Sequence, residues 1–311
     1  MDNFGEYMTK KRSELFFFIK DFTLAVLRFS DRSEIVDTAT GDVVRTLKVK
    51  YVSEAVYCGK YDKLYLKSID NGYVYVYNFD TDELKRLFKL AEGSDRGIFL
   101  SGDEESLIAY TEGNIYEIKT ETDEYRLMYE AKPKCYYGNG WDNTNLKCYE
   151  FVYGSSDMPS TLLRISYDWK KLSADEIKMD GIPVLAYKVS YYPESDTYMM
   201  QGFKHYILVG KRPDPLAKFM SLSEKEINNY TFISEESYRG GCQFGLMHEN
   251  YLAYCPGGKE IKVLDMDSRR LIKRLDIDRT MTTMQYDPKK NTLYVSTGNS
   301  CKIYENFFEP A

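Results

Sequence analysis

The sequence predicts an all-β fold, namely a seven-bladed β-propeller of four-stranded antiparallel blades. The first observation behind this prediction is a recurring hairpin signal: a short apolar-alternating run ends in a polar residue, a turn follows, and a second such run begins. The second is the regular spacing of the signal at about 40 residues. The third is that each end of the chain carries only part of a unit, so that the two ends can complete one blade.

The hairpin signal is clearest at five places. It reads IVDTATGDVVRTL from Ile35, VYVYNFDTDELKRLF from Val74, IYEIKTETDEYRLMY from Ile115, RISYDWKKLSADEI from Arg164 and IKVLDMDSRRLIKRL from Ile261. The polar residues that end the first runs are Asp37, Asn78, Lys119, Asp168, Asp265 and Glu305. Their separations are roughly 41, 41, 49, 97 and 40 residues, and the long gap fits two units. Residues 206–210 supply a strand for the degenerate unit inside that gap.

Two further strands precede most of these hairpins. One is a β-rich run that ends in a turn, as in LYLKSIDNG from Leu64, LIAYTEGN from Leu107, YLAYCPGGK from Tyr251 and TLYVSTGNS from Thr292. The other is a more irregular run further upstream, such as residues 55–58. Four strands in about 40 residues fit a propeller blade, whereas a β-helix has a shorter period and a sandwich has no fixed one.

We expect the units to form one domain over residues 1–311, because no linker, charge block or low-complexity tract interrupts the chain. The expected blades are 14–50, 51–91, 94–131, 132–180, 182–236, 238–278 and 280–308, the last completed by 1–12. The final unit lacks an outer strand, which the N-terminal segment can donate. Closure of the ring in this way leaves few open sheet edges and holds both termini.

Three of the repeated strings resemble those of YVTN-type and WD-repeat propellers: IVDTATGDVVRTL from Ile35, LYVSTGN from Leu293 and YDPKKNTLYV from Tyr286. The resemblance covers the whole chain and implies the propeller fold. The Trp-Asp pair of true WD repeats is replaced by Val36-Asp37, Tyr77-Asn78, Leu264-Asp265 and Tyr304-Glu305. Propellers with this blade include lactonases, quinoprotein dehydrogenases and scaffolds, so the resemblance assigns no catalytic residue.

Charge and hydropathy exclude several classes of partner. The formal net charge is −6 and the basic residues are scattered among acidic ones, so we expect no nucleic-acid partner. The apolar run 15–19 is interrupted by Lys20 and Asp21, so we expect neither a secretory leader nor a membrane span, and a cytoplasmic protein. The six cysteines stand singly, without a CxxC pair: Cys58, Cys135, Cys148, Cys242, Cys255 and Cys301.

The chain carries few groups for catalysis. Its two histidines, His205 and His248, lie in no recognisable motif, and we expect His248 to occupy a solvated turn. Clustered zinc ligands, a Walker loop, a dinucleotide fingerprint and a haem-attachment motif do not occur in the sequence. We therefore predict no catalytic residue, no bound metal and no cofactor, and leave open a calcium or magnesium ion in the central channel.

The binding face of a propeller is usually built by the loops that lead into the innermost strands and the loops between second and third strands. The residues predicted there are Glu54, Asp70, Arg96, Lys134, His205, Arg239, Gln243 and Asn299. Arg96, Lys134 and Arg239 would bring positive charge from three blades, which could hold a carboxylate or a phosphate. Ordinary solvent-exposed side chains are the alternative interpretation.

One stretch, CYYGNGWDNTNLKCYE from Cys135, combines aromatic rings with amides. We predict that Tyr137 and Trp141 form an aromatic contact loop for a sugar or other ligand. The alternative is a long hairpin turn whose rings cover a blade edge.

The function predicted from these observations is a non-enzymatic binding or scaffold propeller that presents a loop-rich face to a protein or peptide. The alternative is a small-molecule-binding or lactonase-like hydrolytic propeller, with a cation and carboxylates in the central channel. Glu54 and Asp70 are the acids that this alternative would use. Recognition of a glycan through Trp141 is a third hypothesis.

Overall fold

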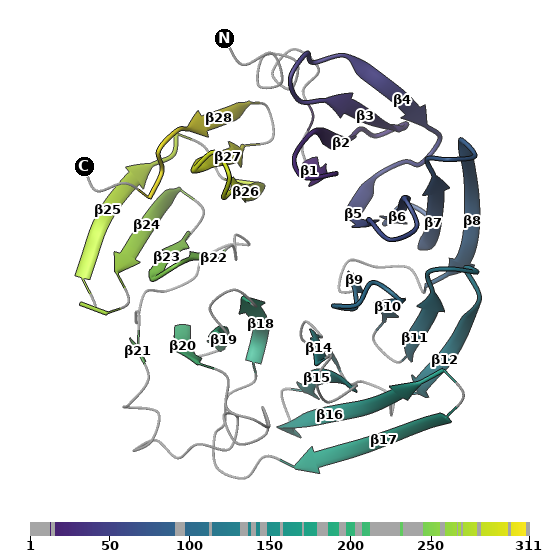
Figure 1. The fold of residues 1–311 in the computed structure, drawn as a ribbon. Helices are drawn as coiled ribbons and strands as arrows, with labels where there is room; N and C mark the ends of the chain where they lie inside the picture. The colour runs from purple at the N-terminus through teal and green to yellow at the C-terminus, as the bar shows by residue number, and fades with distance from the viewer. Residues whose placement is uncertain are drawn as a thin grey trace. The chain divides into compact units, whose positions relative to one another are not determined.

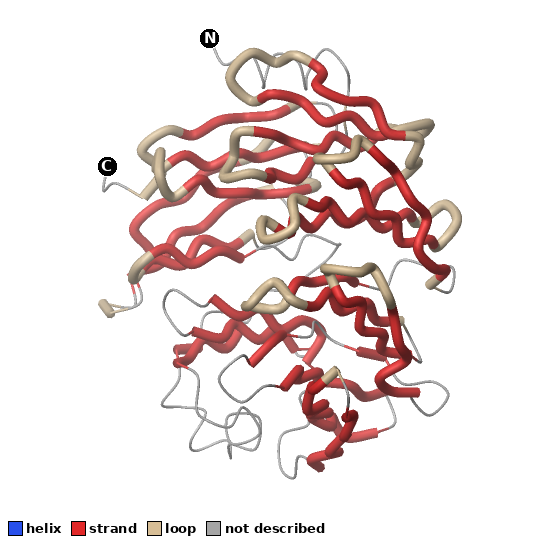
Figure 2. Tube along the Cα trace, turned by 45° about the vertical axis from the view of Figure 1, so that its right-hand side comes forward, coloured by secondary structure: helices blue, strands red, loops and turns tan. Residues whose placement is uncertain are grey.

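A computed structural model describes residues 13, 16–90, 97–111 and 114–130, the strands between residues 136 and 211 with their gaps, residues 231–232, and most of 245–308. These residues form strands, turns and connecting segments, and no helix occurs among them (Figure 2). Accordingly, the described part of the chain contains no helix long and apolar enough to cross a membrane. The chain divides into two compact units, residues 1–94 with 239–311, and residues 95–238.

In its described part, the first unit contains four antiparallel sheets (Figure 1). The first sheet has the order β1 Phe16–Ile19, β2 Leu24–Arg28, β3 Ser33–Asp37 and β4 Val43–Leu47. The second has β5 Val52–Cys58, β6 Lys63–Ser68, β7 Tyr73–Asn78 and β8 Glu83–Lys89. The third has β22 Gly245–His248, β23 Tyr251–Tyr254, β24 Glu260–Asp265 and β25 Arg270–Asp276. The fourth has three described strands, β26 Thr283–Asp287, β27 Thr292–Ser296 and β28 Cys301–Tyr304.

The second unit contains three antiparallel sheets in its described part. One has β9 Gly97–Leu100, β10 Ser106–Tyr110, β11 Asn114–Lys119 and β12 Tyr125–Glu130. The next has β13 Tyr136–Tyr137, β14 Trp141–Asn143, β15 Cys148–Ser155, β16 Met158–Asp168 and β17 Lys171–Lys178, with both β13 and β14 paired to β15. The last has β18 Ala186–Tyr192, β19 Thr197–Gly202, β20 Ile207–Lys211 and β21 Thr231–Phe232.

The prediction of an all-β fold is confirmed in the described residues, where several antiparallel sheets are four-stranded as expected, while the sheet β13–β17 has five strands and the sheet β26–β28 has three. Each of the five predicted hairpins is an antiparallel pair, from β3–β4 to β24–β25, and the strand expected at residues 206–210 is β20. The count of seven blades and the single domain stay predictions. The N-terminal strand stays a prediction as well, because residues 1–12 lie outside the described residues.

Three of the polar residues that end the predicted runs, Asp37, Asn78 and Asp265, organise the turn that follows them through their side chains. The carboxylate Oδ1 of Asp37 accepts hydrogen bonds from the backbone N–H groups of Ala39 and Thr40 at 2.8 and 2.9 Å. Asn78 and Asp265 each accept two bonds of the same kind. Because the bonds from Thr40 and Ala39 favour the charged form, they lower the pKa of Asp37. This local bonding explains why an Asx residue occupies the equivalent position in these three turns.

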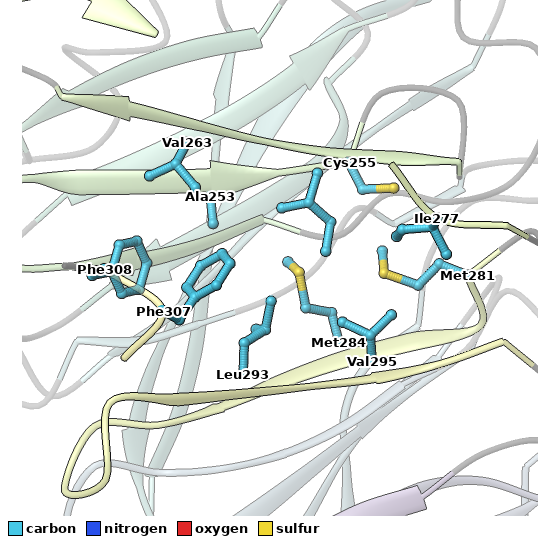
Figure 3. Packing of buried hydrophobic residues seen from close by; sticks show 11 residues of the cluster. Ala253, Cys255, Val263, Ile277, Met281, Met284, Leu293, Val295, Phe307 and Phe308 are labelled. Carbon is cyan, nitrogen blue, oxygen red and sulfur yellow. The ribbon is translucent and has the colours of Figure 1, made fainter. Parts of the chain in front are cut away.

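Apolar side chains fill the spaces between neighbouring sheets of the first unit. Ile35, Val49 and Leu64 are fully buried in the cluster between the first two sheets. A second cluster joins the sheets β22–β25 and β26–β28, with Phe307 and Phe308 packed beside Leu293 (Figure 3). Burying such side chains is the main source of stability in a fold of this kind.

The first and last sheets of the first unit also contact each other. Gln285 of β26 accepts a hydrogen bond from Phe18 N at 2.8 Å, and its amide Nε2 donates to Phe16 O at 3.0 Å. The rings of Phe18 and Tyr294 lie 4.7 Å apart between centroids. Segments at opposite ends of the chain therefore pack together.

A buried polar network joins two sheets of the second unit. Glu117 of β11 is 1% exposed, accepts a bond from Ser106 Oγ at 2.8 Å, and pairs with Arg126 at 2.6 Å. The Arg126 guanidinium stacks 4.6 Å from the Trp169 ring and donates a bond to the Trp169 carbonyl. The pairing compensates the cost of burying the carboxylate, so we assign this network to structure.

Candidate binding face

Three neighbouring segments of the first unit form one part of the predicted binding face, and we call them the turn face. They are the β2–β3 turn (29–32), the connecting segment 48–51 and the β6–β7 turn (69–72). Tyr51 N donates to Phe29 O at 3.2 Å and Ile69 N donates to Tyr51 O at 3.1 Å. Ser68 Oγ donates to Lys50 O at 2.7 Å. Backbone bonds to two different sheets thus hold the connecting segment in place.

Tyr51 occupies an unusual position in this segment. Its φ is 46°, in the left-handed region, and its side chain is 36% exposed. Most other positive-φ residues of the described turns are acids or amides, for example Asp62, Asp82 and Asn291. A bulky side chain is uncommon there because its Cβ crowds the backbone. The aromatic ring is therefore not what the backbone geometry alone would favour.

Two arginines lie beside aromatic rings at this face. The Arg28 guanidinium carbon is 5.6 Å from the Tyr51 ring centroid, and that of Arg32 is 4.8 Å from the ring of Phe29. Arg32 also bonds Glu34 at 2.8 Å and Asp31 at 2.9 Å. The bond to Glu34, opposed by burial and aided by Asp31, raises the pKa of Arg32, which stays cationic.

Glu54 lies at the start of β5, directly opposite Lys67 of β6. The Lys67 ammonium is 4.0 Å from Glu54 Oε1, and the Lys67 side chain is 2% exposed whereas that of Glu54 is 34% exposed. A buried ammonium requires a nearby anion, and the Glu54 carboxylate serves as that anion for Lys67. A cation bound by Glu54 would have to compete with Lys67.

Asp70 is exposed in the β6–β7 turn, at the same end of the same sheet as Glu54. The turn is organised by its neighbour Asn71, which accepts a bond from Tyr73 N at 3.0 Å and donates one to Tyr75 Oη at 2.9 Å. In the part of the chain that the structure describes, no group of three or more His, Cys, Asp and Glu side chains could hold a metal ion. Use of Glu54 and Asp70 by a ligand stays a prediction.

The other predicted residues of the binding face lie outside the described residues: Arg96, Lys134, His205, Arg239, Gln243 and Asn299. Tyr137 and Trp141 belong to the short strands β13 and β14, where they pair with Tyr153 and Glu150 of β15. Binding of a ligand by these two residues stays a prediction.

His248 was expected in a solvated turn, but it is the last residue of β22 and is only partly exposed. Its ring lies 5.0 Å from that of Tyr286 and 5.3 Å from that of Phe308, between centroids. These contacts come from residues distant in the sequence, so the local sequence around His248 could not predict them.

Sequence reasoning missed Tyr51, Arg28 and Phe29. Their importance depends on contacts between two sheets, so no local motif marks them. The available signal was the alternation of Lys48, Val49 and Lys50 ahead of the aromatic residue, between two predicted blades.

No protein-family model matches this chain, and no curated protein matches it in sequence. Among solved structures, hydrazine synthase of Kuenenia stuttgartiensis is similar, with a TM-score of 0.64 and 13% identity over 94% of this chain and 95% of that one. The dihydro-heme d1 dehydrogenase NirN, in complex with DHE, has a TM-score of 0.61 and 13% identity. That match covers 95% of this chain and 64% of the NirN chain, which is thus considerably longer.

Together with the antiparallel four-stranded sheets, these likenesses show that the chain has a β-propeller fold. At such low identity they show the fold alone, since one propeller scaffold supports many unrelated functions. Membership of the YVTN or WD-repeat class stays a prediction.

Proposed function

We propose that this chain is a seven-bladed β-propeller, closed by its two ends, that binds a protein or peptide partner at the turn face and catalyses no reaction. The contacts of Gln285 with β1 support closure, because they join the first and last sheets. The scarcity of histidine and the lack of cofactor motifs in the sequence support a binding role.

The observation that carries the proposal is Tyr51. Its left-handed backbone would suit asparagine or glycine better, at an advantage of about 1 kcal/mol. Anchor residues of protein interfaces are nevertheless typically of this kind: an exposed aromatic ring, next to an arginine, on a backbone held by hydrogen bonds. We therefore attribute this choice of side chain to binding.

The variant Tyr51→Asn distinguishes a role of this side chain in binding from a role in stability. We expect its free energy of unfolding to stay within about 1 kcal/mol of the wild type, because relief of the backbone offsets the lost cation–π contact. We expect partner binding to weaken at least about tenfold, the usual effect of losing an aromatic anchor. Urea unfolding measures the stability, and titration with the purified partner measures the binding.

The partner is identified by photo-cross-linking. A benzophenone amino acid at position 51 should cross-link one protein in cells that make this chain. The same group at Val43, which is 43% exposed on the outer strand β4, should not. Equal products from both positions, or none from position 51, would contradict the proposal. A small molecule retained in native mass spectra, without any protein partner, would favour the channel-binding alternative instead.

A further inference from the structure

Two lysines next to Tyr51 differ from most cations of the described chain. Lys20, Arg32, Arg45 and many others contact a carboxylate within 4.0 Å. Lys48 and Lys50 are exposed, and within the described residues neither side chain has a carboxylate at that distance. Two lysines two positions apart, with no carboxylate partner among the described residues of an acidic protein, have charge available for another molecule.

The backbone beneath these lysines is held firmly. Val49, between them, and Val52, after them, are both fully buried. The carbonyl of Lys50 accepts the bond from Ser68 Oγ, and Tyr51 bonds both neighbouring turns. Alternating exposure is the pattern of an extended chain, which places side chains two residues apart at about 7 Å. The backbone positions that carry the two ammonium groups are therefore fixed and closely spaced.

The surroundings limit what can bind here. Asp31 and Asp70 are exposed on the flanking turns, and the Glu54 carboxylate lies at the start of the next strand. A nucleic acid requires an extended positive track, which these acids interrupt. A short anionic segment that reaches only the two lysines avoids the repulsion. The limited positive area thus favours a peptide over a polynucleotide.

We propose that residues 48–51 bind an acidic segment of the partner in extended conformation. Two carboxylates, two positions apart, pair with Lys48 and Lys50, and an apolar side chain beside them packs on the Tyr51 ring. An extended peptide presents such carboxylates at the same spacing as the lysines. The inference rests on the proposed function, because it assigns the chemistry of the partner that the turn face recognises.

Selection from a random dodecapeptide library on the full-length protein tests this inference. We expect enrichment of sequences with Asp or Glu two positions apart beside an apolar residue. In anisotropy titrations, K48E/K50E should bind the enriched peptide at least tenfold more weakly. Higher salt should also weaken binding, because exposed charge pairs are screened. The control K85E/R270E has the same change in net charge on the outer strands β8 and β25, and it should bind as the wild type does.

Several results would overturn the inference. These are enriched peptides without acids, no enrichment at all, equal weakening in the control variant, or binding of a single-stranded DNA 30-mer that K48E/K50E abolishes. A partner that cross-links from position 51 and binds K48E/K50E normally would also overturn it, while leaving the proposed function intact. The absence of any cross-linked partner would instead remove the proposed function itself.

Discussion

At the scale of single residues, a polar latch joins the β1–β2 and β5–β6 turns. The Lys20 ammonium lies 2.6 and 2.9 Å from the two oxygens of Asp62, and Tyr57 Oη donates to Asp62 Oδ1 at 2.6 Å. The same ammonium lies 3.8 Å from the ring centroid of Phe79. Lys20 and Asp62 both have positive φ, at 48° and 47°, so these contacts stabilise backbone that neither residue favours.

The latch makes stability depend on pH. Burial raises the pKa of Asp62, but the bonds from Lys20 and Tyr57 outweigh it and hold the pKa below its usual value. A lowered pKa in the folded state means that the contribution is complete above the unfolded pKa of about 4 and disappears as the pH falls through the folded value.

We expect Asp62→Asn to lower the free energy of unfolding by about 1–2 kcal/mol at pH 7, since a charge-assisted bond is weakened. The difference from the wild type should shrink below pH 4, which urea titrations at several pH values can measure. Asp80→Asn, an exposed change in the β7–β8 turn, is the matched control and should have little effect. A difference that stays constant with pH would contradict the role of the Asp62 charge.

At the scale of elements, the turns of single sheets are tied together by threonines. Thr38 Oγ1 donates to the carbonyl of Phe22 at 2.6 Å, and Thr120 Oγ1 donates to that of Glu104 at 2.6 Å. In both sheets the acceptor residue has positive φ and lies in the turn between the first two strands. The two sheets therefore share a threonine hydrogen bond that cannot be recognised from their weakly similar sequences.

We expect Thr38→Val and Thr120→Val each to lower the free energy of unfolding by about 1–2 kcal/mol, since valine keeps the shape and leaves a carbonyl without its donor. Thr46→Val, on the exposed outer strand β4, has no such bond and should change stability by less than about 0.5 kcal/mol. Thermal unfolding of the three variants compares them directly. Equal effects at all three positions would refute the importance of these bonds.

The outermost strands of four sheets share a second recurring feature. Each has a β-bulge where it pairs with the third strand of its sheet. The extra residues are Val44, Leu87, Met128 and Ile272. A bulge increases twist and makes an open edge a poorer template for another strand. Val44 and Ile272 are 49% and 38% exposed, whereas Met128 at the equivalent position is 3% exposed, so the bulge alone does not set the exposure of the extra residue.

The sequence predicted the hairpins well because their signal is local: a polar residue such as Asp37 bonds the turn two and three residues later. The candidate face was predicted poorly because its geometry is not local. A register shift between Val52 and Glu54 brings Glu54 opposite Lys67, and a period of two cannot reveal such a shift. Tyr51 likewise acquires its role from Phe29 and Ile69, which belong to different turns.

At the scale of the whole molecule, the closed ring that we propose depends for its stability on the joint between its first and last sheets. Here that joint includes the Gln285 amide, whose oxygen and nitrogen bond the backbone of β1 as a neighbouring strand would. The contact spans 267 residues of sequence for Phe18, so the loop that it closes is nearly the whole chain. Its loss should loosen both ends together, whereas a defect inside one sheet should stay local.

Gln285→Met tests this joint, because methionine has a similar volume and cannot form either bond. We expect a loss of about 2 kcal/mol in the free energy of unfolding, since two hydrogen bonds of about 1 kcal/mol each disappear. Hydrogen exchange should become faster in peptides from both β1 and β26, measured by mass spectrometry in the native state. Asn71→Ala is the matched control, because it also removes two bonds of a side-chain amide, but within one sheet. It should lower stability without faster exchange in β1 or β26, and the same exchange pattern in both variants would show that the Gln285 contact is not a joint between the ends.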